Sequence, residues 1–378
     1  MKVEFYRHQL DDNILNGLKD VFGSVFLTTG PVTGCFEDAF SRYLDVDETV
    51  GLTSCTAGLF LCLKAWGIGS GDEVIVPAMT FVATANAVLH AGATPIFADV
   101  EDATGLMDLD DAERKVTERT RAVIPVHLYG RMVDINAFRD FADRHGLRLL
   151  EDAAHCVEGM FDGIRPGQLG DAACFSFYAT KNITCGEGGA VVTNDKELAD
   201  KIKILRLHGL DRDAAKRYHS FRHVDMIELG WKFNMNDIQA AMLLPQLDTV
   251  DERLRMREHV SGLYASLIGD SLPVTLMTVP LPGLTHALHL CIVRVASSER
   301  ENLIGWLTEN GVGVTVNYRA VHLNSYYRST LGTHEGMCPV AESMGEEVLS
   351  LPFYPTLDDR SVEYVASVLS NYFEKERS

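Results

Sequence analysis

The chain of 378 residues carries 53 acidic and 34 basic side chains, a net charge of −19, and 46% of its residues are hydrophobic. This composition is that of a globular protein, and the length suits one large domain with a smaller one. The acidic balance argues against nucleic acid or an anionic membrane surface as a partner, because both would repel the chain.

Three further features of the sequence favour a cytoplasmic location. The first residues lack the apolar stretch of a secretory signal, and no run of about 18 or more apolar residues would span a membrane. The eight cysteines form no C-x-x-C pair and no cluster with metal-ligand spacing. We therefore expect reduced thiols, no metal site and a reducing, cytoplasmic location.

Short β-branched runs alternate with helical segments in the first half of the chain. The pattern predicts strands at 73–77, 94–99, 121–126, 148–152, 174–178 and 189–193, and helices at 83–91, 135–145 and 196–207. Continuous apolar strands separated by helices are typical of a sheet that is buried on both faces. We therefore predict an α/β fold with a mainly parallel sheet.

The pattern changes after about residue 239. A long helix is expected at 238–257, followed by a strand at 288–295, a helix at 300–310, a strand at 312–317 and a terminal helix at 362–374. This second part is typical of a smaller α+β unit. The predicted boundary lies near residue 250, with a large domain at 1–250 and a small C-terminal domain at 251–378.

Lys181 lies just beyond the strand at 174–178 and beside a turn with three glycines. A lysine at the end of a buried strand can lose part of its hydration, which lowers its pKa, and the neutral amine attacks carbonyl groups. A surface-loop lysine is the ordinary alternative.

Asp152 ends the strand at 148–152, and His155 follows three residues later. Ligands of open α/β sheets bind at this edge, where a carboxylate can hold a proton on a pyridine nitrogen. His155 could hydrogen-bond a ring hydroxyl or stack on the ring. A helix cap for Asp152 and a core position for His155 are the alternatives.

Small hydroxyl residues precede the apolar helix that begins near residue 55. Ser54, Thr56 and the backbone amide of Ala57 suit a phosphate at the start of a helix, as does Ser176, although a plain helix cap would look the same. Phe81 follows a strand end, where an aromatic ring can stack on a planar ligand or pack in the core.

Taken in order, these stretches resemble the DegT-type nucleotide-sugar aminotransferases over nearly the whole chain. This family belongs to the fold-type I pyridoxal phosphate enzymes, related to aspartate aminotransferase. The matching segments lie at 27–31, 54–57, 71–77, 80–86, 151–155, 176–182, 186–189, 230–241 and 351–352.

The resemblance implies a large domain with a mainly parallel sheet, a small C-terminal domain and pyridoxal 5′-phosphate as the cofactor. It makes Lys181 the lysine that binds the cofactor aldehyde and Asp152 the partner of the pyridine nitrogen. His155 then lies near the ring hydroxyl and Phe81 stacks on the ring. The expected phosphate ligands are Ser54, Thr56, Ala57 and Ser176.

The resemblance also implies a homodimer with shared active sites, in which Lys232 and Asn234 complete the site of the other subunit. A surface turn is the alternative for this segment. Many relatives have Val-His-Tyr where this chain has Val316-Asn317-Tyr318, and this difference leaves the substrate open. The residues expected on the substrate side are Thr29, Tyr178, Asn317, Tyr318, Arg319 and His322.

The implied reaction transfers an amino group from glutamate to a nucleotide-linked ketosugar, a 4-keto-6-deoxyhexose or a 4-ketopentose, in amino-sugar biosynthesis. A 3-ketosugar or a cyclitol ketone is an alternative acceptor. A binding or regulatory protein on the same fold is a further alternative, which Lys181 and Asp152 disfavour. Lys181 also disfavours a sugar dehydratase of the same fold, because those relatives have histidine in place of this lysine. A nicotinamide-dependent dehydrogenase would need a G-x-G-x-x-G motif after the first strand, and the sequence contains none.

Overall fold

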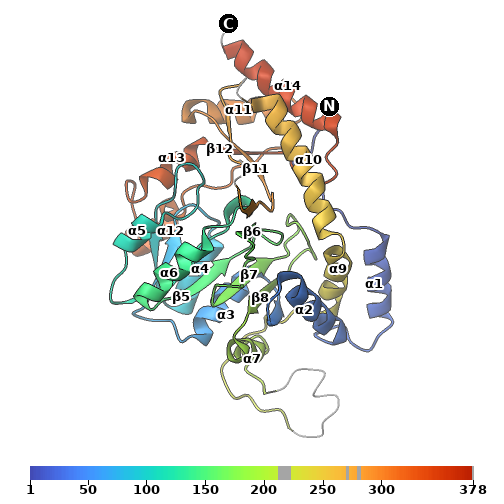
Figure 1. Cartoon of the computed structure of the whole chain (residues 1–378), viewed down its shortest axis with the longest axis vertical. Helices are drawn as coiled ribbons and strands as arrows, with labels where there is room; N and C mark the ends of the chain where they lie inside the picture. The colour runs from blue at the N-terminus through green and yellow to red at the C-terminus, as the bar shows by residue number, and fades with distance from the viewer. Residues whose placement is uncertain (212–222, 270–271, 279–281, 377–378) are drawn as a thin grey trace.

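The computed structural model describes residues 1–211, 223–269, 272–278 and 282–376. Its main sheet has seven strands in the order β1-β8-β7-β5-β4-β2-β3. Figure 1 shows β5, β7 and β8 in the middle of this sheet, with helices on either side. Only β8 runs against its neighbours, so six strands point the same way, and the predicted α/β fold is confirmed. The strands are β1 Glu48–Leu52, β2 Glu73–Pro77, β3 Thr94–Ala98, β4 Thr120–Val123, β5 Arg148–Asp152, β7 Ala172–Ser176 and β8 Gly189–Thr193.

Helices cover this sheet because nearly every residue of its strands is buried. Helix α3 packs on β5, β7 and β8, α4 packs on β2 and β3, and α2 packs on β1 and α9. Gly58 lets α3 lie close to β8, since a Cβ there would be 2.9 Å from a methyl group of Val191. The helices are α1 Asp12–Phe22, α2 Pro31–Leu44, α3 Cys55–Ala65, α4 Ala83–Ala91, α5 Leu109–Arg114, α6 Ile135–His145, α7 Lys196–Leu205 and α9 Asp237–Leu247.

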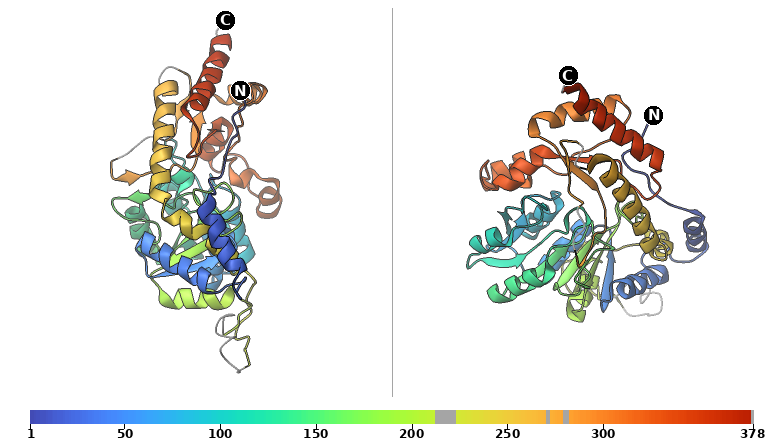
Figure 2. Two further views of the ribbon diagram at one scale, coloured as in Figure 1. Left: turned by 90° about the vertical axis from the view of Figure 1, so that its right-hand side faces the viewer. Right: turned by 45° about the horizontal axis from the view of Figure 1, so that its top comes forward.

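The C-terminal part packs around a three-stranded antiparallel sheet of order β12-β11-β9. Helices α10 and α14 extend away from the main sheet toward the end where both termini lie (Figure 2). The elements are α10 Val250–Ile268, β9 Thr275–Leu276, β11 Cys291–Arg294, α11 Ser297–Glu309, α12 Ser325–Leu331, α13 Pro339–Glu347, β12 Val348–Leu351 and α14 Asp359–Glu376. The described residues also contain short elements: β6 Met160–Phe161 pairs with β10 Leu284–Thr285, and 3-10 turns lie at η1 Leu128–Gly130 and η3 Val321–Leu323.

Buried hydrophobic side chains form two clusters. The larger surrounds the main sheet and includes Tyr327 and Met344 from the C-terminal part. The smaller joins α10, α11 and α14 and includes Val3 from the N-terminus. The chain therefore crosses between the clusters more than once, and the domain boundary near residue 250 stays a prediction.

Two sequence expectations were wrong in detail. The helix expected at 238–257 is divided into α9 and α10: α9 continues through Pro245 to Leu247, and the break lies at Thr249, whose φ of −117° and ψ of 5° are not helical. No strand of the described residues covers 312–317. Instead, the backbone at Gly311 and Gly313 hydrogen-bonds Val3, and Thr315 forms a single bridge with Ser350. The N-terminal segment, distant in sequence, thus pairs with the beginning of the expected strand, and the backbone of β12 bridges it at Thr315.

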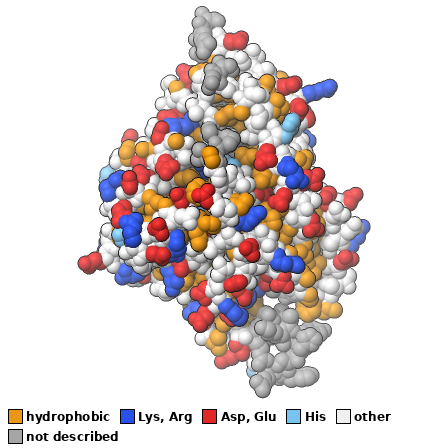
Figure 3. All heavy atoms as spheres, viewed as in Figure 1, with side chains coloured by type: hydrophobic (Ala, Val, Ile, Leu, Met, Phe, Trp, Pro, Cys, Tyr) orange, Lys and Arg blue, Asp and Glu red, His pale blue; other side chains and the backbone are white. Residues whose placement is uncertain are grey.

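Within the described residues, no helix is both long enough and apolar enough to cross a membrane. Acidic and basic side chains are interspersed over the face shown in Figure 3. All eight cysteines are described and free, and all but Cys35 are buried. The described residues contain no group of three or more histidine, cysteine, aspartate or glutamate side chains that could hold a metal ion.

Candidate active site

A cavity of about 500 Å³ lies at the carboxyl-terminal edge of the main sheet. Strands β1, β2, β5 and β7 run in the same direction, so the loops that follow them meet at this edge. Ten of the residues predicted from sequence line the cavity: Ser54, Thr56, Phe81, Asp152, His155, Ser176, Tyr178, Lys181, Asn317 and Tyr318. The topology therefore brings together groups from the four loops that follow these strands, and Asn317 and Tyr318 join them from the C-terminal part.

Lys181 lies in the loop between β7 and β8, and its amine faces the cavity. A hydrogen bond from its backbone N–H to the Tyr178 carbonyl closes the turn that carries it. Its Nζ atom lies 3.4 Å from Nε2 of His289. Burial lowers the pKa of Lys181 to about 8, although Cys55 and Asp152 act in the opposite direction. A large fraction of the amine is therefore neutral near pH 8, as a nucleophile requires.

Asp152 offers a carboxylate at the end of β5. Its Oδ2 accepts a hydrogen bond of 2.8 Å from the Thr84 hydroxyl, and its Oδ1 accepts one of 3.1 Å from the Ala154 N–H. The thiol of Cys55 lies 3.7 Å from Oδ1. Burial raises the pKa of Asp152, while the bonds from Thr84 and Ala154 lower it. The carboxylate is thus held in one orientation and can balance a positive charge in the cavity.

The start of α3 forms the polar end of the cavity. Ser54 caps the helix, and its Oγ accepts a hydrogen bond of 3.1 Å from the Ala57 N–H. Strand β8 passes so close that a Cβ on Gly189 would lie 2.3 Å from the Ser54 carbonyl carbon. Ser54 and Thr56 line the cavity here, beside the positive end of the helix dipole. This combination of hydroxyl groups and a helix start suits a phosphate.

Aromatic and imidazole rings flank the space between Lys181 and Asp152. Phe81 is 55% exposed, and its ring lies 5.9 Å from the ring of Tyr318. His155 accepts a hydrogen bond from the Tyr129 N–H at Nδ1 and lies 3.3 Å from the Tyr318 hydroxyl at Nε2. Burial and nearby Lys181 hold the pKa of His155 well below its usual value, so the imidazole is neutral. An exposed ring opposite a neutral imidazole can enclose a planar ligand.

Three predicted residues form a cluster of their own outside the cavity lining. Asn234 donates a hydrogen bond of 2.6 Å to the Thr29 hydroxyl, and Lys232 donates one to the Asn234 side-chain oxygen. The backbone bridges Leu52–Asn234 and Leu207–Lys232 hold this segment beside β1 and the end of α7. Thr29, Lys232 and Asn234 therefore do not line the cavity of their own chain.

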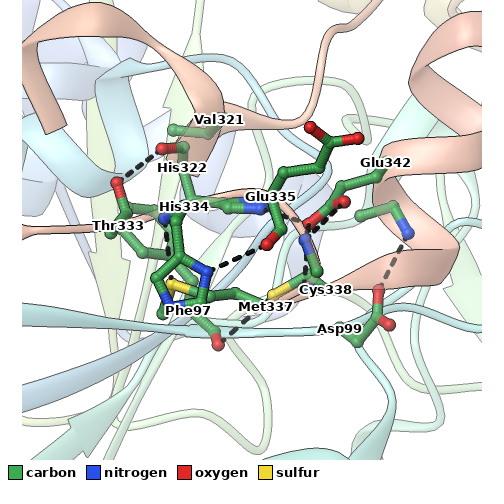
Figure 4. A network of polar contacts seen from close by, with 12 residues as sticks. Phe97, Asp99, Val321, His322, Thr333, His334, Glu335, Met337, Cys338 and Glu342 are labelled. Carbon is green, nitrogen blue, oxygen red and sulfur yellow. Dashed lines mark hydrogen bonds and ion pairs between the residues drawn. The ribbon is translucent and has the colours of Figure 1, made fainter. Parts of the chain in front are cut away.

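Arg319, His322 and Ala57 are also absent from the cavity lining. Arg319 is exposed. His322 is fully buried, and its Nε2 lies 2.8 Å from a carboxylate oxygen of Glu342, which also accepts backbone N–H groups of Gly336 and Cys338 (Figure 4). The structure thus places His322 in a buried polar network, and its expected place on the substrate side stays a prediction. Ala57 contributes its backbone N–H to the Ser54 cap.

Sequence reasoning missed two residues that contact the predicted ones. Thr84 binds Asp152 from the first turn of α4, and His289 reaches Lys181 from the segment before β11. The sequence offered one signal for His289, its position in an apolar stretch that was predicted to be a strand. The structure agrees that this side chain is buried, with 6% of the residue exposed. The sequence does not show that this segment lies against the loop after β7, because 108 positions separate the two residues.

Comparisons with known proteins bear on this arrangement. Residues 8–370 match the DegT/DnrJ/EryC1/StrS aminotransferase family. The chain belongs to this family. It is 41% identical to the spore coat polysaccharide biosynthesis protein SpsC of Bacillus subtilis over 349 residues, which cover 90% of each chain.

Solved structures agree with the family assignment. Spr1654 of Streptococcus pneumoniae in its PMP-form matches with a TM-score of 0.92 and 30% identity, covering 99% of this chain and 100% of that chain. Helicobacter pylori PseC, an aminotransferase involved in the biosynthesis of pseudoaminic acid, matches with a TM-score of 0.93 and 28% identity over 99% and 100% of the chains.

The predicted family and cofactor are therefore confirmed: this chain is a pyridoxal phosphate-dependent aminotransferase. The site fits the cofactor, since it combines a lysine of lowered pKa with a buried carboxylate, an exposed aromatic ring and hydroxyl groups at a helix start.

The lowered pKa of Lys181 predicts how the cofactor-free protein takes up pyridoxal phosphate. Only the neutral amine attacks the aldehyde, so the rate constant should rise about tenfold per pH unit well below pH 8 and level off above it. Stopped-flow absorbance between pH 6 and 10 measures this profile. A midpoint near the ordinary lysine pKa of about 10.4 would contradict it.

Proposed function

We propose that this aminotransferase moves an amino group from glutamate to a nucleotide-linked ketosugar, a 4-keto-6-deoxyhexose or 4-ketopentose. The proposal depends chiefly on one observation: the chain matches SpsC, a polysaccharide biosynthesis protein, over 90% of both lengths. The resemblance to PseC over 99% of the chain adds support, because that enzyme acts in the biosynthesis of a sugar acid. The eight free cysteines favour a cytoplasmic location.

The cavity residues have distinct roles in this proposal. When bound, pyridoxal phosphate supplies an aldehyde that reacts with amines and a ring that accepts electrons. The Lys181 amine binds the cofactor and then carries a proton from the Cα of the amino donor. Asp152 holds the proton on the pyridine nitrogen, and Phe81 covers one ring face. Ser54, Thr56 and Ser176, with the start of α3, hold the phosphate.

The acceptor sugar takes the open side of the cavity in this proposal. Tyr178 is 46% exposed there, and Asn317 and Tyr318 line the neighbouring wall. The Asn317 side-chain oxygen accepts a hydrogen bond of 2.8 Å from the Ser350 hydroxyl. Its amide NH₂ group contacts the Tyr318 hydroxyl and has a second N–H to donate to a sugar oxygen.

A homodimer completes the site in this proposal. Lys232 and Asn234 lie together with Thr29, outside the cavity of their own chain, and a cationic side chain with an amide suits the phosphate of a neighbouring subunit. This placement agrees with the shared active sites that the family resemblance implies.

Substrate choice can be tested with a panel of nucleotide-linked 3- and 4-ketosugars, a cyclitol ketone and glutamate. We expect a 4-keto nucleotide sugar to give the highest kcat/KM, with one 2-oxoglutarate formed per amino sugar. NMR of the product assigns the ring carbon and its configuration. Turnover of the cyclitol ketone alone would overturn the proposed acceptor class, and turnover with alanine but not glutamate would overturn the donor.

A further inference from the structure

Histidine 289 is held beside Lys181 by a close approach of two backbone segments. The His289 N–H donates to the Tyr129 carbonyl, and the Ala287 N–H donates to the Gly130 carbonyl, at 2.9 and 2.8 Å. Gly130 has a φ of 102°, and a Cβ there would lie 2.8 Å from the backbone nitrogen of Leu288. A glycine is therefore required for this approach. The imidazole is thus held by main-chain contacts and not only by side-chain packing.

A chain of hydrogen bonds leads from a buried arginine to this imidazole. The Arg257 Nη2 atom on α10 lies 2.5 Å from Oε1 of Glu158, and both residues are buried. The other carboxylate oxygen of Glu158 accepts a hydrogen bond of 2.7 Å from Nδ2 of Asn182. The same Nδ2 atom donates to the Ala287 carbonyl at 2.9 Å. Oδ1 of Asn182 lies 3.2 Å from Nδ1 of His289.

The direction of each hydrogen bond in this chain follows from chemistry. Arg257 only donates, and the Glu158 carboxylate beside it only accepts. Asn182 must therefore turn its NH₂ group toward Glu158 and its oxygen toward His289. Because that oxygen only accepts, the His289 proton lies on Nδ1. The unprotonated Nε2 then presents its lone pair to the Lys181 amine at 3.4 Å.

We infer that His289 is a positioning residue for the reaction: Nε2 accepts an N–H of the Lys181 amine and thereby turns the amine lone pair toward the cavity. A neutral amine has one lone pair, so holding an N–H on one side leaves the lone pair to approach the cofactor aldehyde. The inference depends on the proposed role of Lys181 as the lysine that binds the cofactor.

The surroundings keep His289 in this neutral form. Burial, followed by electrostatic interactions with Lys181, His155 and Arg257, holds the pKa of His289 well below its usual value. The ring of His155 lies 4.4 Å away, centre to centre, on the cavity side. Protonation of His289 would place a second positive charge beside the Lys181 ammonium and near Arg257. Like charges repel, so both side chains disfavour the protonated imidazole.

Two variants separate positioning from packing. The amide of glutamine reaches the position of Nε2, whereas the amide of asparagine reaches only that of Nδ1. H289Q can therefore still accept from Lys181, while H289N keeps only the contact with Asn182. The cofactor-free proteins are mixed with saturating pyridoxal phosphate above pH 8, trapped with borohydride at timed intervals, and the Lys181 peptide is quantified by mass spectrometry.

We expect H289N to form the Lys181 adduct about 10- to 100-fold more slowly than wild type, and H289Q to keep most of the wild-type rate. Equal slowing in both variants would show that the ring acts by packing alone and would overturn the inference. An unchanged rate in H289N would also overturn it. If wild type forms no adduct at Lys181, the proposed role of Lys181 fails, and the inference fails with it.

A second measurement uses the unaltered protein and needs no activity. Nitrogen-15 NMR of histidine-labelled protein, with His289 assigned by its loss in H289Q, reports which ring nitrogen carries the proton. We expect a protonated Nδ1 and an unprotonated Nε2 at pH 8. A proton on Nε2, or a doubly protonated ring, would overturn the inference.

Discussion

Replacing Lys181 with alanine should lower the rate of amino transfer from glutamate at least about 10⁴-fold. The substitution removes the only lysine that lines the cavity among the described residues, and with it the amine that binds the cofactor and carries the proton. Its pKa of about 8 is what makes this amine a competent base near neutral pH. Single-turnover absorbance with pyridoxal phosphate and glutamate measures the loss.

A lysine elsewhere in the fold provides the matched control for this prediction. Lys64 is partly buried on α3, where its Nζ lies 3.5 Å from the Ala91 carbonyl, and it does not line the cavity. Lys64→Ala should therefore keep the wild-type rate. If Lys181→Ala transfers amino groups as fast as Lys64→Ala, the role assigned to Lys181 is wrong.

The substitution Asp152→Asn should lower the same rate about 10²- to 10³-fold without unfolding the protein. Asparagine can keep its oxygen toward the Ala154 N–H, and its NH₂ group can donate to the Thr84 hydroxyl oxygen, so the local geometry is kept. The negative charge is lost, and with it the stabilisation of a proton on the pyridine nitrogen. We expect the loss in kcat rather than in thermal stability.

Asp195→Asn is the control that makes the same chemical change outside the cavity. Asp195 caps α7 and accepts N–H groups of Glu197 and Leu198 at 2.9 and 3.1 Å. Asparagine caps helices about as well as aspartate, so this variant should keep both its rate and its unfolding temperature. A wild-type kcat in Asp152→Asn would show that the charge at residue 152 is dispensable.

Local patterns were sufficient for the large sheet and for most of the cavity. Continuous apolar runs predicted six of its seven strands with small shifts of their ends, as at β7, where the strand begins two residues earlier than expected. Asp152, Lys181, Ser54 and Phe81 could be recognised because each follows a strand or begins a helix. In a parallel sheet such positions meet at one edge whatever the details of packing.

The sequence by itself determined the α/β class, the strand ends that carry chemistry and the family with its cofactor, because each depends on periodicity or on short motifs. Only the tertiary structure decided that His289 faces Lys181, that Thr84 binds Asp152 and that His322 is buried against Glu342. These contacts join segments that are far apart along the chain or turn side chains in directions that strand and helix periodicity leave open. Their partners are chosen by packing and by the need of buried polar groups for hydrogen bonds.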